Sequence, residues 1–154
     1  RGDISVCNRS HYGDVLVTRV HKLVTPDECQ KRYRQIRHFE RMLAEEGTLI
    51  LKFFLLISKD EQLERLRARL DDPAKQWKFS SADVKERGNW DKYMEAFEEM
   101  LSNTGAEHAP WFIVPSNRKW FRNLLVSQVV LRAMQDMKLE WPQPEVDLTR
   151  VTLE

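Results

Sequence analysis

Apolar residues along the chain form two patterns that alternate. Short continuous runs of strand length lie at residues 4–7, 49–57 and 111–114, and such runs are typical of parallel strands covered by helices on both faces. Apolar positions at helical spacing lie between and after these runs. The last of them predict a helix over about 117–137 with one apolar face, formed by Trp120, Leu124, Leu131 and Met134. The alternation predicts an α/β fold in which helices flank a parallel sheet.

Two helix starts are marked by capping-box spacing, at 25–28 and at 58–61. The first predicts a helix of about 20 residues that ends near Gly47. Its apolar face carries Tyr33, Ile36 and Leu43. The second predicts a helix that ends at 71–73, with a buried face formed by Leu63, Leu66 and Leu70. Shorter signals predict a helix start at 80–83 and, after a break at 88–89, a helix whose core face carries Trp90, Tyr93, Phe97 and Leu101.

Polar residues follow the first apolar run directly. Asn8, Arg9 and Ser10 stand at what would be the carboxyl end of a buried strand, where open α/β sheets bind their ligands. The Arg guanidinium donates paired hydrogen bonds to phosphate oxygens, so this group suits an oxyanion. From spacing alone, a strand-end turn capped by Asn and Ser, with a solvated Arg, is the favoured explanation of the same residues.

Cationic residues gather in two further places. Arg118 and Lys119 follow the third apolar run, at the carboxyl end of another predicted strand. The segment 65–78 has three more positive than negative charges, and Trp77 and Phe79 are interleaved with its lysines. This segment is either a solvated helix face with a docked loop or a mobile cover that closes over a polyanion.

Composition excludes several classes of protein. A formal net charge of +1 gives no global argument for binding nucleic acid or an anionic membrane, and no apolar run approaches the roughly 20 residues of a membrane span. Two cysteines cannot form a disulfide framework, so we expect a reduced, cytoplasmic setting. The four histidines lack the spacing of metal ligands. The chain does not begin with Met, so we expect it to lie inside a longer protein.

The glycines show that the sequence lacks a glycine-rich phosphate-binding loop. None of the five, Gly2, Gly13, Gly47, Gly88 and Gly105, belongs to a G-x-x-x-x-G-K-[ST] sequence or a related phosphate loop. If the protein acts on phosphate, the backbone amides that bind the phosphate therefore do not come from a glycine-rich loop of this sequence.

Several motifs together resemble the polyphosphate kinase 2 family. Asn8-Arg9-Ser10-His11-Tyr12 is similar to its Walker B region, and the resemblance covers nearly the whole chain. It continues through residues 57–62, 73–80, 90–93, 107–111 and 115–120. The form with His11 resembles the members that act on nucleoside monophosphates.

The resemblance implies a P-loop kinase sheet like that of thymidylate kinase, with a helical lid at residues 59–92. The family's Walker A strand lies upstream of the Walker B motif. We therefore expect residues 1–154 to be the C-terminal part of one kinase domain that lacks this strand. The β-branched residues at 15–20 favour a strand by propensity, whereas the resemblance implies a helix there. The implied reaction is phosphoryl transfer between inorganic polyphosphate and AMP or ADP, with Mg²⁺, in a homo-oligomer.

The resemblance also implies roles for individual residues. Asn8 would contact metal or phosphate, and Arg9 would clamp a phosphate. Asp83 would hold the lid or join the metal shell. Arg69, Lys75 and Lys78 would be lid cations, while Arg118 and Lys119 would contact nucleotide or polyphosphate. One departure is Gly13, where members usually carry Glu.

Two other functions stay open from the sequence. The chain could be a non-catalytic remnant that binds polyanion or supports oligomerisation, or it could be part of an ATP-dependent nucleotide kinase with the same sheet. If a central strand is missing, residues 1–154 expressed alone should aggregate, because exposed strand edges pair with other chains.

Overall fold

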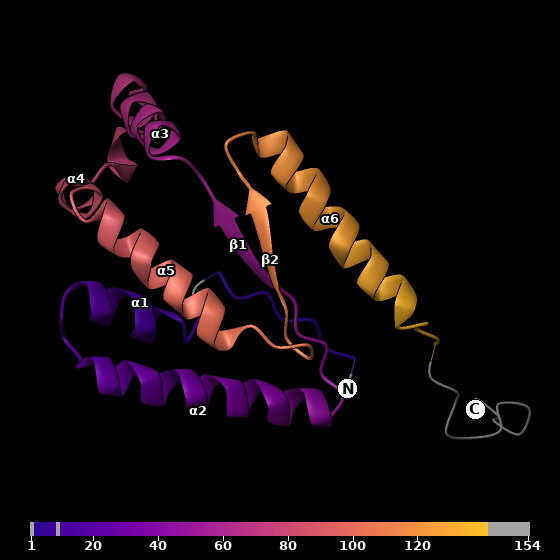
Figure 1. The fold of residues 1–154 in the computed structure, drawn as a ribbon. Coiled ribbons are helices and arrows are strands. Elements are labelled where there is room, and N and C mark those ends of the chain that lie inside the picture. Colours follow the sequence, from indigo (N-terminus) through magenta and orange to yellow (C-terminus); the bar gives the residue numbers. More distant parts are fainter. Residues whose placement is uncertain (1, 9, 142–154) are drawn as a thin grey trace, which may run out of the picture.

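The computed structural model describes residues 2–8 and 10–141. Helices and strands alternate along the chain, as the sequence predicts (Figure 1). The elements are α1 (Gly13–Val20), α2 (Pro26–Glu45), β1 (Lys52–Leu56), α3 (Lys59–Asp71), a 3₁₀ turn (Gln76–Lys78), α4 (Ser81–Arg87), α5 (Trp90–Thr104), β2 (Trp111–Pro115) and α6 (Lys119–Asp136).

The two strands are parallel neighbours. Lys52 pairs with Trp111 at one end and Leu56 pairs with Pro115 at the other. Figure 1 shows α1, α2 and α5 together on one side of the strands and α6 on the other. Phe54 of β1 packs on Phe97 of α5, with ring centroids 4.7 Å apart. The predicted α/β architecture with a parallel sheet and flanking helices is confirmed for the described residues.

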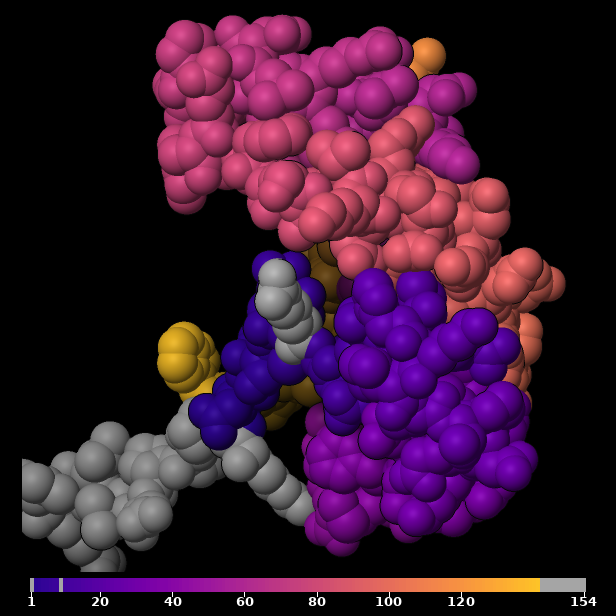
Figure 2. Space-filling model, turned by 90° about the vertical axis from the view of Figure 1, so that its left-hand side faces the viewer, coloured from indigo at the N-terminus to yellow at the C-terminus, as the bar shows by residue number. Residues whose placement is uncertain are grey.

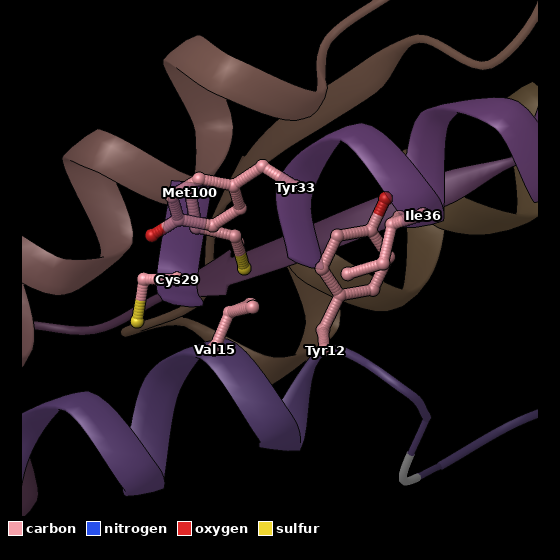
Figure 3. Packing of buried hydrophobic residues seen from close by; sticks show 6 residues of the cluster. All are labelled: Tyr12, Val15, Cys29, Tyr33, Ile36 and Met100. Carbon is pink, nitrogen blue, oxygen red and sulfur yellow. The ribbon is translucent and has the colours of Figure 1, made fainter. Parts of the chain in front are cut away.

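The main apolar core lies between α1, α2 and α5. Its buried members, shown in Figure 3, are Tyr12, Val15, Cys29, Tyr33, Ile36 and Met100. Burying a side chain of this size contributes about 1.5–3 kcal/mol relative to leaving it exposed. This cluster therefore fixes the N-terminal helices against α5, and Trp111 of β2 packs against it from the sheet.

Both capping predictions are confirmed. The Thr25 Oγ1 accepts a hydrogen bond from the Glu28 amide at 3.2 Å, and Pro26 occupies the first helical position. The Ser58 Oγ accepts from the Glu61 amide at 3.1 Å. Such caps satisfy amides that have no partner within the helix.

Residues 13–20 form a helix despite their strand propensity. Val15 and Val20 are buried, and Val15 is a member of the main apolar core with 0% of its surface exposed. Burial of one helical face outweighs the small intrinsic cost of β-branched residues in a helix. The helix implied by the resemblance is confirmed.

Two predictions about apolar segments are wrong. Residues 4–7 form no strand: Ile4 is 75% and Val6 is 92% exposed, because neither described strand lies beside them to supply hydrogen bonds. Leu70 is 46% exposed, whereas Leu66 is the buried residue of α3. The predicted helix over about 117–137 is confirmed as α6, and its apolar stripe is exposed, at Trp120, Leu124, Leu131 and Met134. Of the helices in the described part of the chain, none has the length and apolarity to cross a membrane.

Candidate functional site

A pocket of about 500 Å³ opens at the carboxyl ends of the two parallel strands. The connection from β1 to α3, the connection from β2 to α6 and the first turn of α5 form its walls. Its lining includes Ser58, Lys59, Trp90, Asn117, Arg118 and Phe121. Open α/β sheets bind ligands at this edge, so the pocket is the first candidate for a substrate site.

Side-chain hydrogen bonds hold the floor of this pocket. The Ser58 amide donates to Asn117 Oδ1 at 2.9 Å, and Asn117 Nδ2 donates to Ser58 Oγ at 3.2 Å. Arg65 Nη2 donates to the Ser116 carbonyl at 2.7 Å, and Arg65 Nε donates to Glu61 at 2.7 Å. These bonds connect the ends of β1 and β2 with the first turns of α3, which makes the pocket floor pre-organised.

A second pocket of about 300 Å³ lies beneath α3 and α4. Its lining includes Ile57, Gln62, Arg65, Arg69, Asp83 and Glu86. Ile57 also lines the first pocket, so the two adjoin at the carboxyl end of β1. Arg69 Nη1 donates to Asp83 Oδ2 at 3.3 Å, which joins α3 to α4 across this pocket.

Apart from the bonds of Arg65 to the Ser116 and Asn117 carbonyls, the segment 59–92 contacts the rest of the chain at few polar points. In Figure 2, α3 and α4 (magenta to pink) form one end of the molecule, with α5 between them and the first two helices. His21, at the end of α1, lies 3.1 Å from the carboxylate of Glu86 on α4, and the Tyr93 hydroxyl donates to the same carboxylate at 2.8 Å. The hydrogen bond from Tyr93 lowers the pKa of Glu86, and the His21 charge lowers it further.

The other two cations that were predicted for a lid lie in the turn after α3. Lys75 Nζ is 2.5 Å from Asp72 Oδ2, and this hydrogen bond, with one from the Ala74 amide, lowers the pKa of Asp72. Lys78 Nζ lies 5.0 Å from the centre of the Trp77 ring, and Trp77 is 78% exposed. Both lysines are exposed to solvent.

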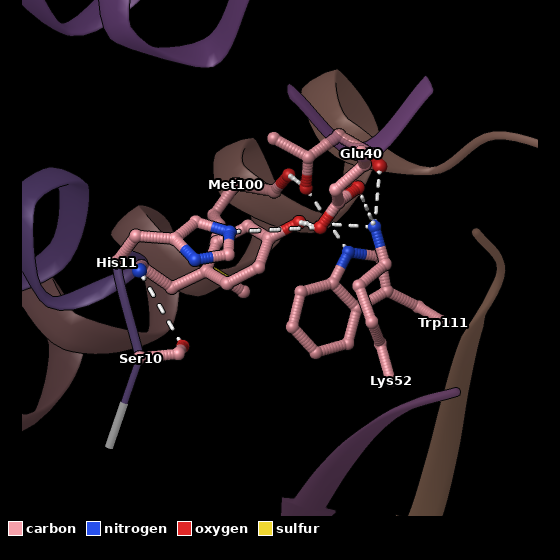
Figure 4. Close-up of polar contacts among 8 residues, drawn as sticks. Ser10, His11, Glu40, Lys52, Met100 and Trp111 are labelled. Atoms are coloured by element: carbon pink, nitrogen blue, oxygen red, sulfur yellow. Dashed lines mark hydrogen bonds and ion pairs between the residues drawn. The ribbon is translucent and has the colours of Figure 1, made fainter. Parts of the chain in front are cut away.

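A buried polar cluster lies at the other end of the sheet (Figure 4). Lys52 Nζ donates to Glu40 Oε2 at 2.7 Å, to the Tyr12 hydroxyl at 2.9 Å and to the Thr104 carbonyl at 2.9 Å. The Tyr12 hydroxyl donates to Glu40 Oε1 at 2.6 Å. All four residues are at most 7% exposed. We call Tyr12, Glu40, Lys52 and Thr104 the buried cluster.

Burial changes the titration of this cluster. It lowers the pKa of the Lys52 ammonium, while the contact with Glu40 opposes that change. Burial and the hydrogen bond to Glu40 raise the pKa of the Tyr12 hydroxyl. The Lys52 ammonium also lies 4.9 Å from the centre of the Trp111 ring, a favourable cation–π contact.

Comparison with known proteins identifies the family. The sequence model described as Polyphosphate kinase 2 matches residues 1–142. The chain belongs to the polyphosphate kinase 2 family. It is 51% identical over its full length to the AMP/ADP-polyphosphate phosphotransferase of Meiothermus ruber. It is 46% identical over 93% of its length to the ADP-polyphosphate phosphotransferase of Rhodopseudomonas palustris.

A solved structure of the family has the same fold. The crystal structure of Polyphosphate Kinase 2 from Arthrobacter aurescens TC1 matches 92% of this chain with a TM-score of 0.88 and 46% identity. The chain spans 58% and 54% of the length of the two relatives named above, and 50% of the chain in that crystal structure.

The structure distributes the predicted site residues of this polyphosphate kinase 2 chain over several places. Arg118 lines the first pocket, and Lys119 begins α6 beside it. Arg69 and Asp83 meet in the second pocket. Asn8 is exposed and follows the extended segment 4–7. Arg9 lies outside the described residues, so its predicted role stays a prediction.

The described residues do not form a complete magnesium site. In residues 2–8 and 10–141, no three His, Cys, Asp or Glu side chains are grouped so that they could hold a metal ion. Asp83 is engaged by Arg69, and Asn8 offers one neutral amide oxygen. A neutral amide such as that of Asn8 suits contact with magnesium through water, because the ion prefers carboxylates and retains several waters.

Sequence reasoning missed the buried cluster, although a signal was present. Lys52 is the one charged residue in the apolar run 49–57, and Glu40 falls on the predicted buried face of α2, between Ile36 and Leu43. A charged group that enters a core requires a partner of opposite charge. A buried cation in one element and a buried carboxylate in another therefore predict that the two form an ion pair.

Proposed function

We propose that this chain is part of a polyphosphate-dependent nucleotide phosphotransferase that acts on AMP, ADP or both. The observation that carries this proposal is the 51% identity, over the whole chain, to a relative named AMP/ADP-polyphosphate phosphotransferase. We propose further that the parallel sheet is part of a P-loop kinase domain like that of thymidylate kinase. The parallel strands with a pocket at their carboxyl ends support this proposal.

The first pocket supports a nucleotide site. Trp90 and Phe121 give it aromatic walls against which a nucleobase can pack, while Lys59 and Arg118 supply positive charge for phosphates. Ser58 and Asn117 hold each other across its floor, so little ordering is required when a ligand enters. Phosphoryl transfer requires mainly this kind of positioning, together with cations where charge spreads in the transition state.

We propose that residues 59–92 act as a lid over the polyphosphate. Arg69, Lys75 and Lys78 bring positive charge to this segment, and its few polar contacts with the remaining chain would permit movement. A closing lid excludes water, which otherwise competes with the nucleotide for the transferred phosphoryl group.

We also propose that the protein uses Mg²⁺, forms a homo-oligomer and works in the cytoplasm. For magnesium, the contribution of the described residues would be indirect contacts from Asn8 and Asp83. The exposed apolar stripe of α6 supports association between copies, because contiguous apolar surface often marks an interface. The two free cysteines, Cys7 and Cys29, support a reducing environment.

An assay with two phosphate donors tests the proposed function. The full-length protein would be incubated with AMP and polyphosphate, with ADP and polyphosphate, and with AMP and ATP, each with magnesium. We expect nucleotide phosphorylation with polyphosphate and none above background with ATP. Activity with ATP alone would instead identify an ATP-dependent nucleotide kinase, and binding of polyphosphate without turnover would identify a non-catalytic module.

A further inference from the structure

The buried cluster connects parts of the chain that are far apart in sequence. Tyr12 precedes α1, Glu40 lies on α2, Lys52 begins β1 and Thr104 ends α5. The three hydrogens of the Lys52 ammonium match three acceptors, the carboxylate of Glu40, the hydroxyl of Tyr12 and the carbonyl of Thr104. The geometry of each group in the cluster is therefore fixed by the others.

Stability alone does not explain this arrangement. Taking a carboxylate and an ammonium out of water costs several kcal/mol for each ion, and an apolar pair of similar volume is often equally stable or more stable. A Leu–Met pair, for example, would fill a similar volume without desolvating charges. An apolar pair cannot form hydrogen bonds with the Tyr12 hydroxyl, so it cannot fix the direction of that hydroxyl.

Tyr12 is the last residue of the motif Asn8-Arg9-Ser10-His11-Tyr12. Its ring also packs edge-on against Trp111, with centroids 4.9 Å apart, and the ring of His11 lies 4.7 Å from its own. His11 Nε2 is 3.6 Å from Glu40 Oε1, the same oxygen that accepts from Tyr12. Glu40 thus contacts two consecutive residues of the motif.

The described residues before Ser10 are not packed into the core. Residues 4–8 are exposed and form no strand, whereas a turn runs from Ser10 to Gly13. In this turn the Gly13 amide donates to the Ser10 carbonyl at 3.1 Å, and the Asp14 amide donates to the His11 carbonyl at 3.2 Å. The turn that carries Ser10 is consequently joined to the buried cluster through His11 and Tyr12.

We propose that Glu40 and Lys52 are positioning residues for the Asn8–Ser10 segment, and that they act through Tyr12 and His11. The inference rests on the proposed phosphotransferase function, in which that segment handles phosphate. The ion pair lies among α2, β1 and α5, so the position of the segment is tied to the same sheet whose far end carries the candidate pocket.

A double replacement separates positioning from stability in the full-length protein. Lys52→Met alone leaves the Glu40 carboxylate buried without its cation, so we expect both the melting temperature and kcat to fall. Adding Glu40→Leu should return the melting temperature to within about 3 °C of the wild-type value. We nevertheless expect kcat to stay roughly tenfold or more below wild type, with the KM for AMP changed less than about threefold. Tyr12→Phe should also lower kcat, with little change in melting temperature.

The matched control is the pair Glu28 and Lys31 on α2, whose charged atoms are 3.8 Å apart and whose side chains are 41% and 57% exposed. Glu28→Leu with Lys31→Met makes the same chemical change at the surface and should leave kcat unchanged. If kcat recovers together with the melting temperature in the Glu40→Leu, Lys52→Met protein, the cluster is only structural and the proposal is wrong.

Amide hydrogen exchange supplies a readout that does not depend on activity. In the Glu40→Leu, Lys52→Met protein, the amides of residues 10–14 should exchange roughly tenfold faster, while those of α5 keep their protection. Unchanged exchange at residues 10–14 would overturn the proposal. A wild-type protein without polyphosphate-dependent turnover would refute the proposed function, and the exchange measurement would still decide whether the cluster holds the segment.

Discussion

Asn117 and Ser58 exchange two hydrogen bonds between the carboxyl ends of β2 and β1. The Asn117 amide group accepts from the Ser58 backbone at 2.9 Å and donates to the Ser58 hydroxyl at 3.2 Å. The Ser58 hydroxyl also caps α3 by accepting from Glu61. One side-chain amide therefore joins the end of a strand to the start of a helix, at the floor of the candidate pocket.

Asn117→Asp should impair this site specifically. The carboxylate can still accept from the Ser58 amide, but it cannot donate to the hydroxyl, and it places a negative charge beside Arg118 in a pocket proposed for phosphates. We expect kcat/KM for the nucleotide to fall roughly tenfold or more, which corresponds to about 1.4 kcal/mol or more of transition-state stabilisation. Steady-state kinetics of the full-length protein measure this effect.

Asn123→Asp on α6 is the matched control, because it adds the same charge at an exposed position of the adjoining helix. We expect its kinetics to match those of the wild type. Equal losses in the two variants would mean that added negative charge acts generally and that the pocket floor has no special role.

Local signals in the sequence predicted much of the fold. The capping boxes at Thr25 and Ser58 place both helix starts correctly, because the cap depends on residues within one turn. The apolar runs at 49–57 and 111–114 also form strands, at Lys52–Leu56 and Trp111–Pro115, where each supplies the other with a neighbour. The helix starts needed no information about distant parts of the chain.

Predictions that depended on a distant partner were less accurate. Residues 4–7 have the composition of a buried strand, but a strand forms only where a neighbour supplies hydrogen bonds. For residues 13–20, propensity and resemblance gave opposite predictions, and burial of Val15 against α2 and α5 decides for the helix. Tertiary contacts outweigh intrinsic preferences of this size.

The candidate site was predicted in part. The cations at 118–119 lie at a strand end, as expected from the apolar run before them. The partners of Lys52 and Asn117 were not identified, because each lies more than ten residues away in the sequence and on a different element. Spacing along one element shows that Lys52 and Glu40 are each exceptions to an apolar pattern, but it does not show where Asn117 finds its partner.

Lys78→Gln tests the lid cations. Lys75 is paired with Asp72, whereas Lys78 lies over the exposed Trp77 ring, and we expect it to be available for a polyanion. The KM for polyphosphate should rise about threefold to tenfold, and the KM for AMP should change less than about twofold. The same substitution at Lys31, on the exposed face of α2, serves as the control. A KM for polyphosphate equal to that of wild type would remove Lys78 from the site.

The contact between Glu86 and Tyr93 predicts a dependence of stability on pH. The hydrogen bond from the Tyr93 hydroxyl, assisted by His21, holds the pKa of Glu86 below its ordinary value of 4.5. Below pH 4.5 the unfolded chain therefore binds more protons at this residue than the folded chain does. The stabilisation from Glu86 is complete above pH 4.5 and is lost as the pH falls through the folded-state pKa.

Glu86→Gln should consequently reduce the acid sensitivity of the full-length protein. Between about pH 5 and pH 3, we expect the melting temperature of the variant to fall less than that of the wild type. Glu98→Gln, at an exposed position of α5, is the control and should follow the wild-type curve. Parallel curves for Glu86→Gln and wild type would show that this contact does not contribute to folding stability.

Arg9→Lys tests the predicted role of Arg9 as the residue that clamps a phosphate. Lys retains the positive charge but lacks the planar guanidinium, so the substitution is costly only where paired hydrogen bonds to a phosphate are required. We expect kcat to fall roughly tenfold or more with a melting temperature within about 2 °C of wild type. Unchanged turnover would mean a solvated residue, and a parallel loss of stability and turnover would mean a structural one. Steady-state kinetics and a thermal melt of this single variant in the full-length protein distinguish the three outcomes.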